Sequence, residues 1–159
     1  MRINFNFMLF FFLMTGLFCS CNPVKNEPLS TSNLIFKTAK DSILFTGAAI
    51  KSYNGTSNEV IFSDSNIIKK IMSNRKIKCY LNNDSLFVFT YAVDYMSSFV
   101  NDLVLYENLY DAKYSFEDGY PNWIDNVGIN TIRTQNKEKR ASSWAKFISQ
   151  LKFEGRYKE

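Results

Sequence analysis

Hydrophobic and polar residues alternate along most of the chain after residue 33, with the period of two that is typical of β-strands. The alternation is clearest in KIKCYLN (76–82). Gly47 predicts a bulge or bend within one segment, and Asn54-Gly55 predicts a turn that makes a hairpin of residues 48–62. The predicted strands are residues 33–40, 42–54, 58–64, 76–82, 85–94, 99–107 and 112–118.

Two segments change to the helical period. SDSNIIKKIMSN (63–74) gathers Ile67, Ile68, Ile71 and Met72 on one helical face, and Ser63 or Asp64 can cap the helix start. In residues 137–153, apolar side chains recur at i, i+3, i+4 and i+7, which predicts an amphipathic helix packed on the sheet. A helix that lies on a membrane or binds a partner is the alternative. The apolar stripe consists of Trp144, Phe147, Ile148 and Leu151.

The order of these elements predicts an α+β fold. We expect a curved, mainly antiparallel β-sheet, with one short helix and the C-terminal amphipathic helix packed on it. Antiparallel pairing is expected because short turns join most strands. Residues 85–94 are apolar on both faces, which predicts a central strand. Residues 34–159 are expected to form a single domain, and residues 129–135 fit neither period.

The N-terminus has a different composition. Residues 1–6 contain one positive charge and no acid, and residues 7–18 are almost wholly apolar. That apolar run is too short to span a membrane, which takes about 20 residues. A charged start, a short apolar core and small residues are the pattern of a secretory signal peptide.

The end of this segment, LFCSCN (17–22), resembles the lipobox of bacterial lipoproteins, in particular those of the Bacteroidota. Small residues precede Cys21 as in that motif, although Phe18 stands where the usual lipobox has leucine. The resemblance covers residues 1–22. It implies that residues 1–20 are a lipoprotein signal peptide and that Cys21 becomes the acylated first residue of the mature chain.

The expected lipid anchor also predicts a tether and a cellular location. Residues 21–33 would be the lipidated cysteine and a flexible tether, since prolines and small polar residues leave little to bury. The resemblance implies a cell-envelope protein with acyl chains, palmitate among them, held at the outer membrane. The tether has no acidic cluster after Cys21, which favours a periplasm-facing domain over a surface-exposed one.

The net charge of +4 conceals an uneven distribution. Residues 84–125 contain eight acidic residues and one basic residue, Lys113, whereas the flanking segments are basic. This distribution does not indicate a nucleic-acid partner. Either the segments neutralise each other in an ordinary mixed surface, or the acidic middle faces a basic partner.

The sequence contains few candidate residues for catalysis or for binding a metal or cofactor. The chain contains no histidine, which excludes Ser-His-Asp and Cys-His centres and any histidine metal site. No phosphate-binding glycine loop is present, and Cys79 is predicted to face the core, so we expect no cofactor and no metal. A carboxylate-based hydrolase would need two facing acids. The candidate acids are Asp94, Asp102, Glu107, Asp111, Glu117, Asp118 and Asp125.

Aromatic residues mark the best candidate binding surface. Six of the nine tyrosines lie between residues 91 and 120. Tyrosine suits interfaces and sugar or peptide faces, although it is also simply favoured in β-sheets. The residues that we predict to contact a partner or ligand are Tyr95, Tyr110, Asp111, Asp118, Tyr120 and Trp123.

Three functions remain open. We expect a membrane-anchored lipoprotein with a non-catalytic domain that binds another envelope protein, an inhibitor or immunity protein being one version. The alternative is a glycan- or peptide-binding module with a pocket lined by Tyr110, Tyr120 and Trp123, and the third is the hydrolase. The tripeptides 41–43 and 84–86 also match a short pattern that is glycosylated in some exported Bacteroidota proteins.

Overall fold

The computed structural model of the protein describes residues 32–159. The predicted signal peptide (residues 1–20), the acylated Cys21 and the tether up to residue 31 lie outside the described residues. The predictions made for them remain predictions.

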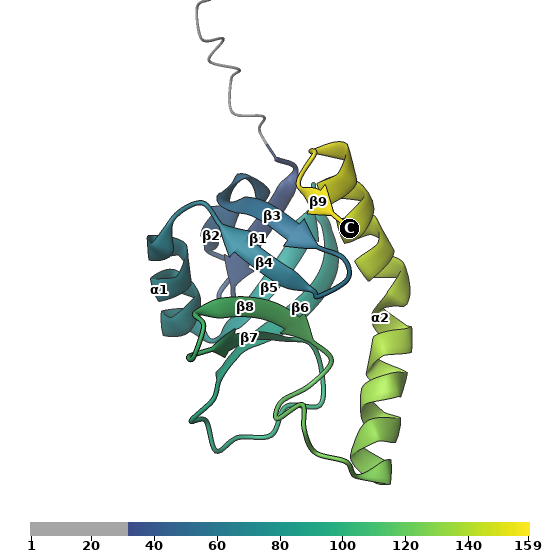
Figure 1. The fold of residues 1–159 in the computed structure, drawn as a ribbon. Helices are drawn as coiled ribbons and strands as arrows, with labels where there is room; N and C mark the ends of the chain where they lie inside the picture. The colour runs from purple at the N-terminus through teal and green to yellow at the C-terminus, as the bar shows by residue number, and fades with distance from the viewer. Residues whose placement is uncertain (1–31) are drawn as a thin grey trace, which may run out of the picture.

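Nine strands form one curled, mainly antiparallel sheet, and two α-helices pack against it (Figure 1). The predicted α+β fold is therefore confirmed. The strand order is β2-β1-β5-β6-β7-β8-β4-β3-β9. The strands are β1 (Leu34–Thr38), β2 (Ile43–Thr46), β3 (Ile50–Asn54), β4 (Glu59–Phe62), β5 (Lys76–Leu81), β6 (Asp84–Val93), β7 (Val104–Asn108), β8 (Lys113–Glu117) and β9 (Tyr157–Lys158).

Local turn chemistry sets the hairpins as predicted. β3 and β4 pair as the expected antiparallel hairpin, and β5 pairs with β6 in the same way. The bend predicted at Gly47 is the 3₁₀ turn η2 (Gly47–Ala49), which splits the single predicted strand 42–54 into β2 and β3. A Cβ on Gly47 would lie 2.8 Å from the Cβ of Leu34, so only glycine allows β1 to pass this close.

One pairing departs from the antiparallel pattern. β6 lies centrally, as predicted, but it pairs with β7 in parallel, with Thr90 opposite Val104. A parallel pair needs a crossover connection, and residues 94–103 provide it. This loop contains residues 99–103, which were wrongly predicted as strand. It covers a second, small core cluster on the outer sheet face, made of Ala92, Val104 and Tyr120.

Helix α1 (Ser65–Asn74) matches the prediction. The side chain of Asp64 caps it by accepting a hydrogen bond from the backbone N–H of Asn66 at 2.8 Å. Ile67, Ile68 and Ile71 are buried as predicted, whereas Met72, predicted on the same face, is 40 % exposed at its margin. Burial of this face holds α1 at the edge of the sheet seen on the left of Figure 1.

Helix α2 (Val127–Phe153) begins ten residues earlier than predicted. Asn126 caps it by accepting from the N–H of Ile129. In the first half, arginines rather than apolar residues face the protein, and Arg133 and Arg140 are both buried. An apolar period is therefore absent there, which is why the sequence pattern did not reveal this part of the helix.

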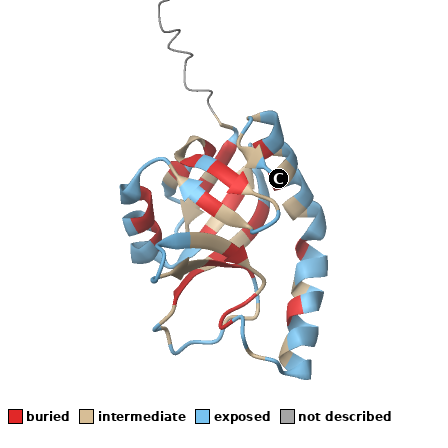
Figure 2. Cartoon of the chain, viewed as in Figure 1, coloured by how far each residue is buried: buried red, intermediate tan, exposed pale blue. Residues whose placement is uncertain are grey.

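The second half of α2 packs on the inner face of the sheet, as its apolar stripe predicts. Phe147 and Leu151 are fully buried, and Trp144 and Ile148 pack partly buried against the same core. Figure 2 shows the buried residues of α2 on the side that faces the strands. After the helix, β9 pairs in parallel with β3. This strand was not predicted, because it is only two residues long.

Phe147 and Phe153 make a matched pair for testing this packing. Phe147→Ala removes a fully buried ring and should lower the free energy of unfolding by about 3–5 kcal/mol. Phe153→Ala, in the same helix at an 85 % exposed site, should change it by less than about 0.5 kcal/mol. Urea unfolding measures both, and equal losses would contradict the packing described.

Candidate functional site

Two loops and the start of α2 form one end of the molecule, at the bottom of Figure 1. These loops are residues 94–103, between β6 and β7, and residues 118–126, between β8 and α2. Val100 and Tyr120 join them through two backbone hydrogen bonds of 2.9 and 2.8 Å. We call this region the loop end.

Tyr120 is the centre of the loop end and is 1 % exposed. Its hydroxyl oxygen lies 2.8, 3.0 and 3.2 Å from the backbone carbonyl oxygens of Val93, Asp94 and Met96, which share its single proton. Burial raises the pKa of this hydroxyl. The prediction that Tyr120 is an exposed contact residue is wrong, because its ring and hydroxyl hold the two loops together.

Exposed apolar side chains lie beside Tyr120 or next in sequence to residues that bond it. Tyr95 is 73 % exposed and adjoins Met96, whereas Trp123 is 65 % exposed and its ring lies 6.0 Å from that of Tyr120. Phe99 is 64 % exposed and adjoins Val100. Val127, the first residue of α2, is 84 % exposed. We call Tyr95, Phe99, Trp123 and Val127 the loop-end patch.

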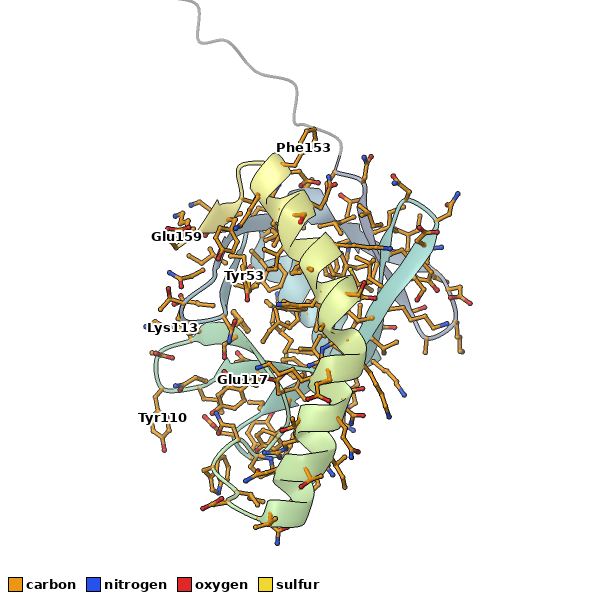
Figure 3. The ribbon with its side chains drawn as sticks, turned by 90° about the vertical axis from the view of Figure 1, so that its right-hand side faces the viewer. Tyr53, Tyr110, Lys113, Glu117, Phe153 and Glu159 are labelled. Atoms are coloured by element: carbon orange, nitrogen blue, oxygen red, sulfur yellow. The ribbon has the colours of Figure 1, made fainter. Side chains whose placement is uncertain are left out.

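Tyr110 lies beside this region, in the turn between β7 and β8. Asp94, the neighbour of Tyr95, accepts a hydrogen bond from the N–H of Leu109 at 3.2 Å and another from the Tyr106 hydroxyl. Tyr110 is 95 % exposed. Figure 3 shows it pointing away from the protein, far from Phe153 at the opposite end. Three predicted contact residues, Tyr95, Tyr110 and Trp123, are therefore exposed.

The predicted acidic contacts are engaged within the molecule. Asp118 accepts from Arg140 Nη2 at 2.6 Å and from Lys137 Nζ at 2.8 Å. Asp111 forms a weaker pair with Lys113 at 3.4 Å. The acidic middle of the sequence is thus partly neutralised by the basic C-terminal helix, in agreement with the mixed-surface interpretation.

Arg140 joins α2 to both loops. Its side chain is 8 % exposed, and its second terminal nitrogen pairs with Asp102 in the loop after β6. One turn earlier, the side-chain amide of Asn136 donates to the carbonyl of Asn101 at 2.7 Å. These contacts hold the first half of α2 on the loop end without an apolar interface.

Other carboxylates are bound to tyrosine hydroxyls. Glu107 accepts hydrogen bonds from Tyr91 and, at 3.1 Å, from Tyr114. Burial, followed by the nearby Glu107 charge, raises the pKa of Tyr114 to about 12, and burial with the Glu107 hydrogen bond raises the pKa of Tyr91. These groups stay protonated at neutral pH and stabilise the sheet through neutral–ionic hydrogen bonds.

A pocket of about 220 Å³ lies between α2 and strand β8. Its apolar floor is made of Leu103, Phe116 and Trp144, and its rim carries Asn58, Asp118, Lys137 and Arg140. Asp118 is the one carboxylate among the described residues that line it. We call this cavity the α2 pocket. Tyr110 and Trp123 do not line it, so it is not the pocket that the sequence predicted.

The structure also locates the other residues that the sequence offered as reactive or modified groups. Cys79 is fully buried, as predicted, and burial raises its thiol pKa. Ser42 and Ser85 of the two tripeptides are exposed. Residues 32–159 contain no group of three or more His, Cys, Asp or Glu side chains that could hold a metal ion. Within the same range, neither helix is long and apolar enough to cross a membrane.

Comparisons with known proteins give no relative. No protein-family model, curated protein or solved structure matches the chain. The functional argument therefore rests on the geometry of the chain itself.

Sequence reasoning missed three features of this region. Phe99 was placed inside a strand, Arg140 was not singled out, and Trp144 was assigned to the core alone. The pairing of Arg140 with Asp102 and Asp118 joins residues 38 and 22 positions apart. The basic excess after residue 126, opposite the acidic middle, was the one signal that could have indicated it.

Gly119 and Gly128 test the loop end by a matched substitution. A Cβ on Gly119 would lie 2.2 Å from Arg133 Nε, and Arg133 is itself buried with its Nη2 donating to the Pro121 carbonyl at 2.8 Å. Gly119→Ala should therefore lower the free energy of unfolding by about 1–3 kcal/mol. Gly128→Ala meets nothing closer than 3.4 Å and should be neutral or slightly stabilising, because alanine favours helix.

Urea denaturation of the two variants measures this difference. A Gly119→Ala protein as stable as Gly128→Ala would show that Arg133 does not pack against the 118–126 loop as described.

Proposed function

We propose that the protein is a lipid-anchored lipoprotein of the cell envelope, with a non-catalytic domain that binds another envelope protein through the loop-end patch. The anchor is the acylated Cys21, which holds the protein on the outer membrane. The domain would face the periplasm. The protein would therefore contact both the membrane and a partner protein.

The single observation that carries this proposal is the placement of the patch. Ser32, the first described residue, donates a hydrogen bond to Glu154 at 2.6 Å, next to the last turn of α2. The patch lies on the loop end, where the same helix begins. A helix of 27 residues is about 40 Å long, so a tether ending at residue 32 would leave the patch at the far end of the domain.

The chemistry of the patch also suits a protein interface. Aromatic side chains are enriched in the buried centres of interfaces and supply rigid contact area. The loops that carry them are pinned by Tyr120 and Arg140, so binding would order few groups and lose little entropy.

The hydrolase receives less support. Asp94, Asp102, Glu107 and Asp118 each already accept hydrogen bonds from hydroxyl, guanidinium or ammonium groups of the described residues. Each of these carboxylates is thus already engaged within the fold, and one carboxylate of residues 32–159 lines the α2 pocket, whereas a hydrolase would need two facing acids.

The residues before Cys21 resemble a lipobox, and this resemblance supports the anchor. One acyl chain binds a membrane only marginally, at about 0.8 kcal/mol per buried CH₂, so two or more chains are needed for a stable anchor. A diacylated or triacylated Cys21 would satisfy this requirement.

The proposal is tested by cross-linking the full-length protein in its native membrane and identifying captured proteins by mass spectrometry. Trp123→Ser should weaken capture of a stoichiometric partner by about thirtyfold, the effect of losing a central aromatic contact of about 2 kcal/mol. Phe153→Ser, at the other end of α2, is the matched control and should leave capture unchanged.

Cys21→Ala separates the anchor from the interface. It should release the protein from the membrane fraction while leaving binding to the purified partner intact. Retention of Cys21→Ala in the membrane would refute the anchor. Equal capture by the Trp123→Ser and Phe153→Ser variants would refute the interface.

A further inference from the structure

We propose that the α2 pocket binds one uncharged sugar ring of hexose size. This site is separate from the loop-end patch, and the inference does not depend on the proposed protein partner. It concerns the cavity between α2 and β8, whose rim and floor differ sharply in polarity.

The cavity is flanked by two small side chains of the helix. Ala141 and Ala145 are one turn apart on α2, are exposed and both line the pocket. Residues at this spacing share a helix face. A larger side chain at either position would fill part of the cavity.

The volume limits the size of the ligand. The volume of the cavity is about 220 Å³. It is smaller than the pockets of about 300–1,000 Å³ that hold drug-sized molecules. One sugar ring fits this size, and a peptide segment does not.

The rim offers both donors and acceptors. Each Asp118 oxygen has one partner, and a carboxylate has about four acceptor sites. Lys137 is 67 % exposed and uses one of its three N–H donors on Asp118. Asn58 accepts from the Tyr53 hydroxyl at 2.7 Å through Oδ1, which leaves its amide N–H groups as donors. Hydroxyl groups, which donate and accept, match such a rim.

The charges favour an uncharged ligand. Arg140 and Lys137 are balanced by Asp102 and Asp118, and the four groups are already paired with each other. A charged ligand would therefore meet no uncompensated opposite charge on this rim. A neutral ligand can use the remaining donors and acceptors for hydrogen bonds.

The floor supplies an aromatic surface. The Trp144 ring is fixed by contacts with Phe116 and Phe87, at centroid distances of 5.4 and 5.3 Å. It is only partly buried and lines the cavity. An aromatic ring beside polar groups suits a ligand with one apolar face and a hydroxylated edge, which describes a pyranose ring.

Trp144 also provides the test, because the chain has two tryptophans and the other, Trp123, is in the loop-end patch. In a Trp123→Phe background, Trp144 is the sole tryptophan reporter. We expect a saturable change in its fluorescence with at least one of D-glucose, D-galactose, D-mannose and N-acetyl-D-glucosamine, with a dissociation constant in the millimolar range.

In that background, Ala145→Leu is the test variant and Ser142→Leu is its matched control. Both add the same side chain to an exposed position of α2, but only residue 145 lines the pocket. Ala145→Leu should weaken sugar binding at least tenfold, and Ser142→Leu should not change it. No saturable response to any of the four sugars, or equal binding by the two variants, would overturn the proposal.

Discussion

The buried guanidinium of Arg140 is the contact on which both candidate sites depend. It joins α2 to the loop after β6 through Asp102 and to the end of β8 through Asp118. Both carboxylates are partly exposed, and an ion pair of this kind contributes little net stability because solvent screens it. Its effect here is positional: it fixes where the helix stands relative to the loop end, and it forms one wall of the α2 pocket.

Helix α2 therefore has two kinds of interface. Its second half is held by apolar burial of residues such as Phe147, and its first half by directed polar contacts such as that of Asn136 to Asn101. Apolar burial tolerates small sliding movements, whereas hydrogen bonds require a defined geometry. The combination gives a stable helix whose far end is accurately placed, which suits a domain that presents a surface.

Local patterns predicted much of the fold and less of the site. The alternation in residues 76–82, the Asn54-Gly55 turn and the stripe around Phe147 depend on neighbouring residues, and they were correct. The parallel β6–β7 pair depends on how residues 94–103 fold back, which no local period encodes. Likewise, composition singled out Tyr95, Tyr120 and Trp123 of the loop end, but it could not distinguish buried Tyr120 from exposed Trp123, because that difference arises from tertiary packing.

The central claim is that a protein partner meets the loop end. Its most direct test is site-specific photo-cross-linking of the full-length protein in its native membrane, with p-benzoylphenylalanine at Phe99 or at Phe153. Both residues are exposed phenylalanines, at opposite ends of the domain. The account predicts a discrete protein adduct from position 99 and none from position 153. An adduct from position 153 alone, or equal adducts from both, would contradict it.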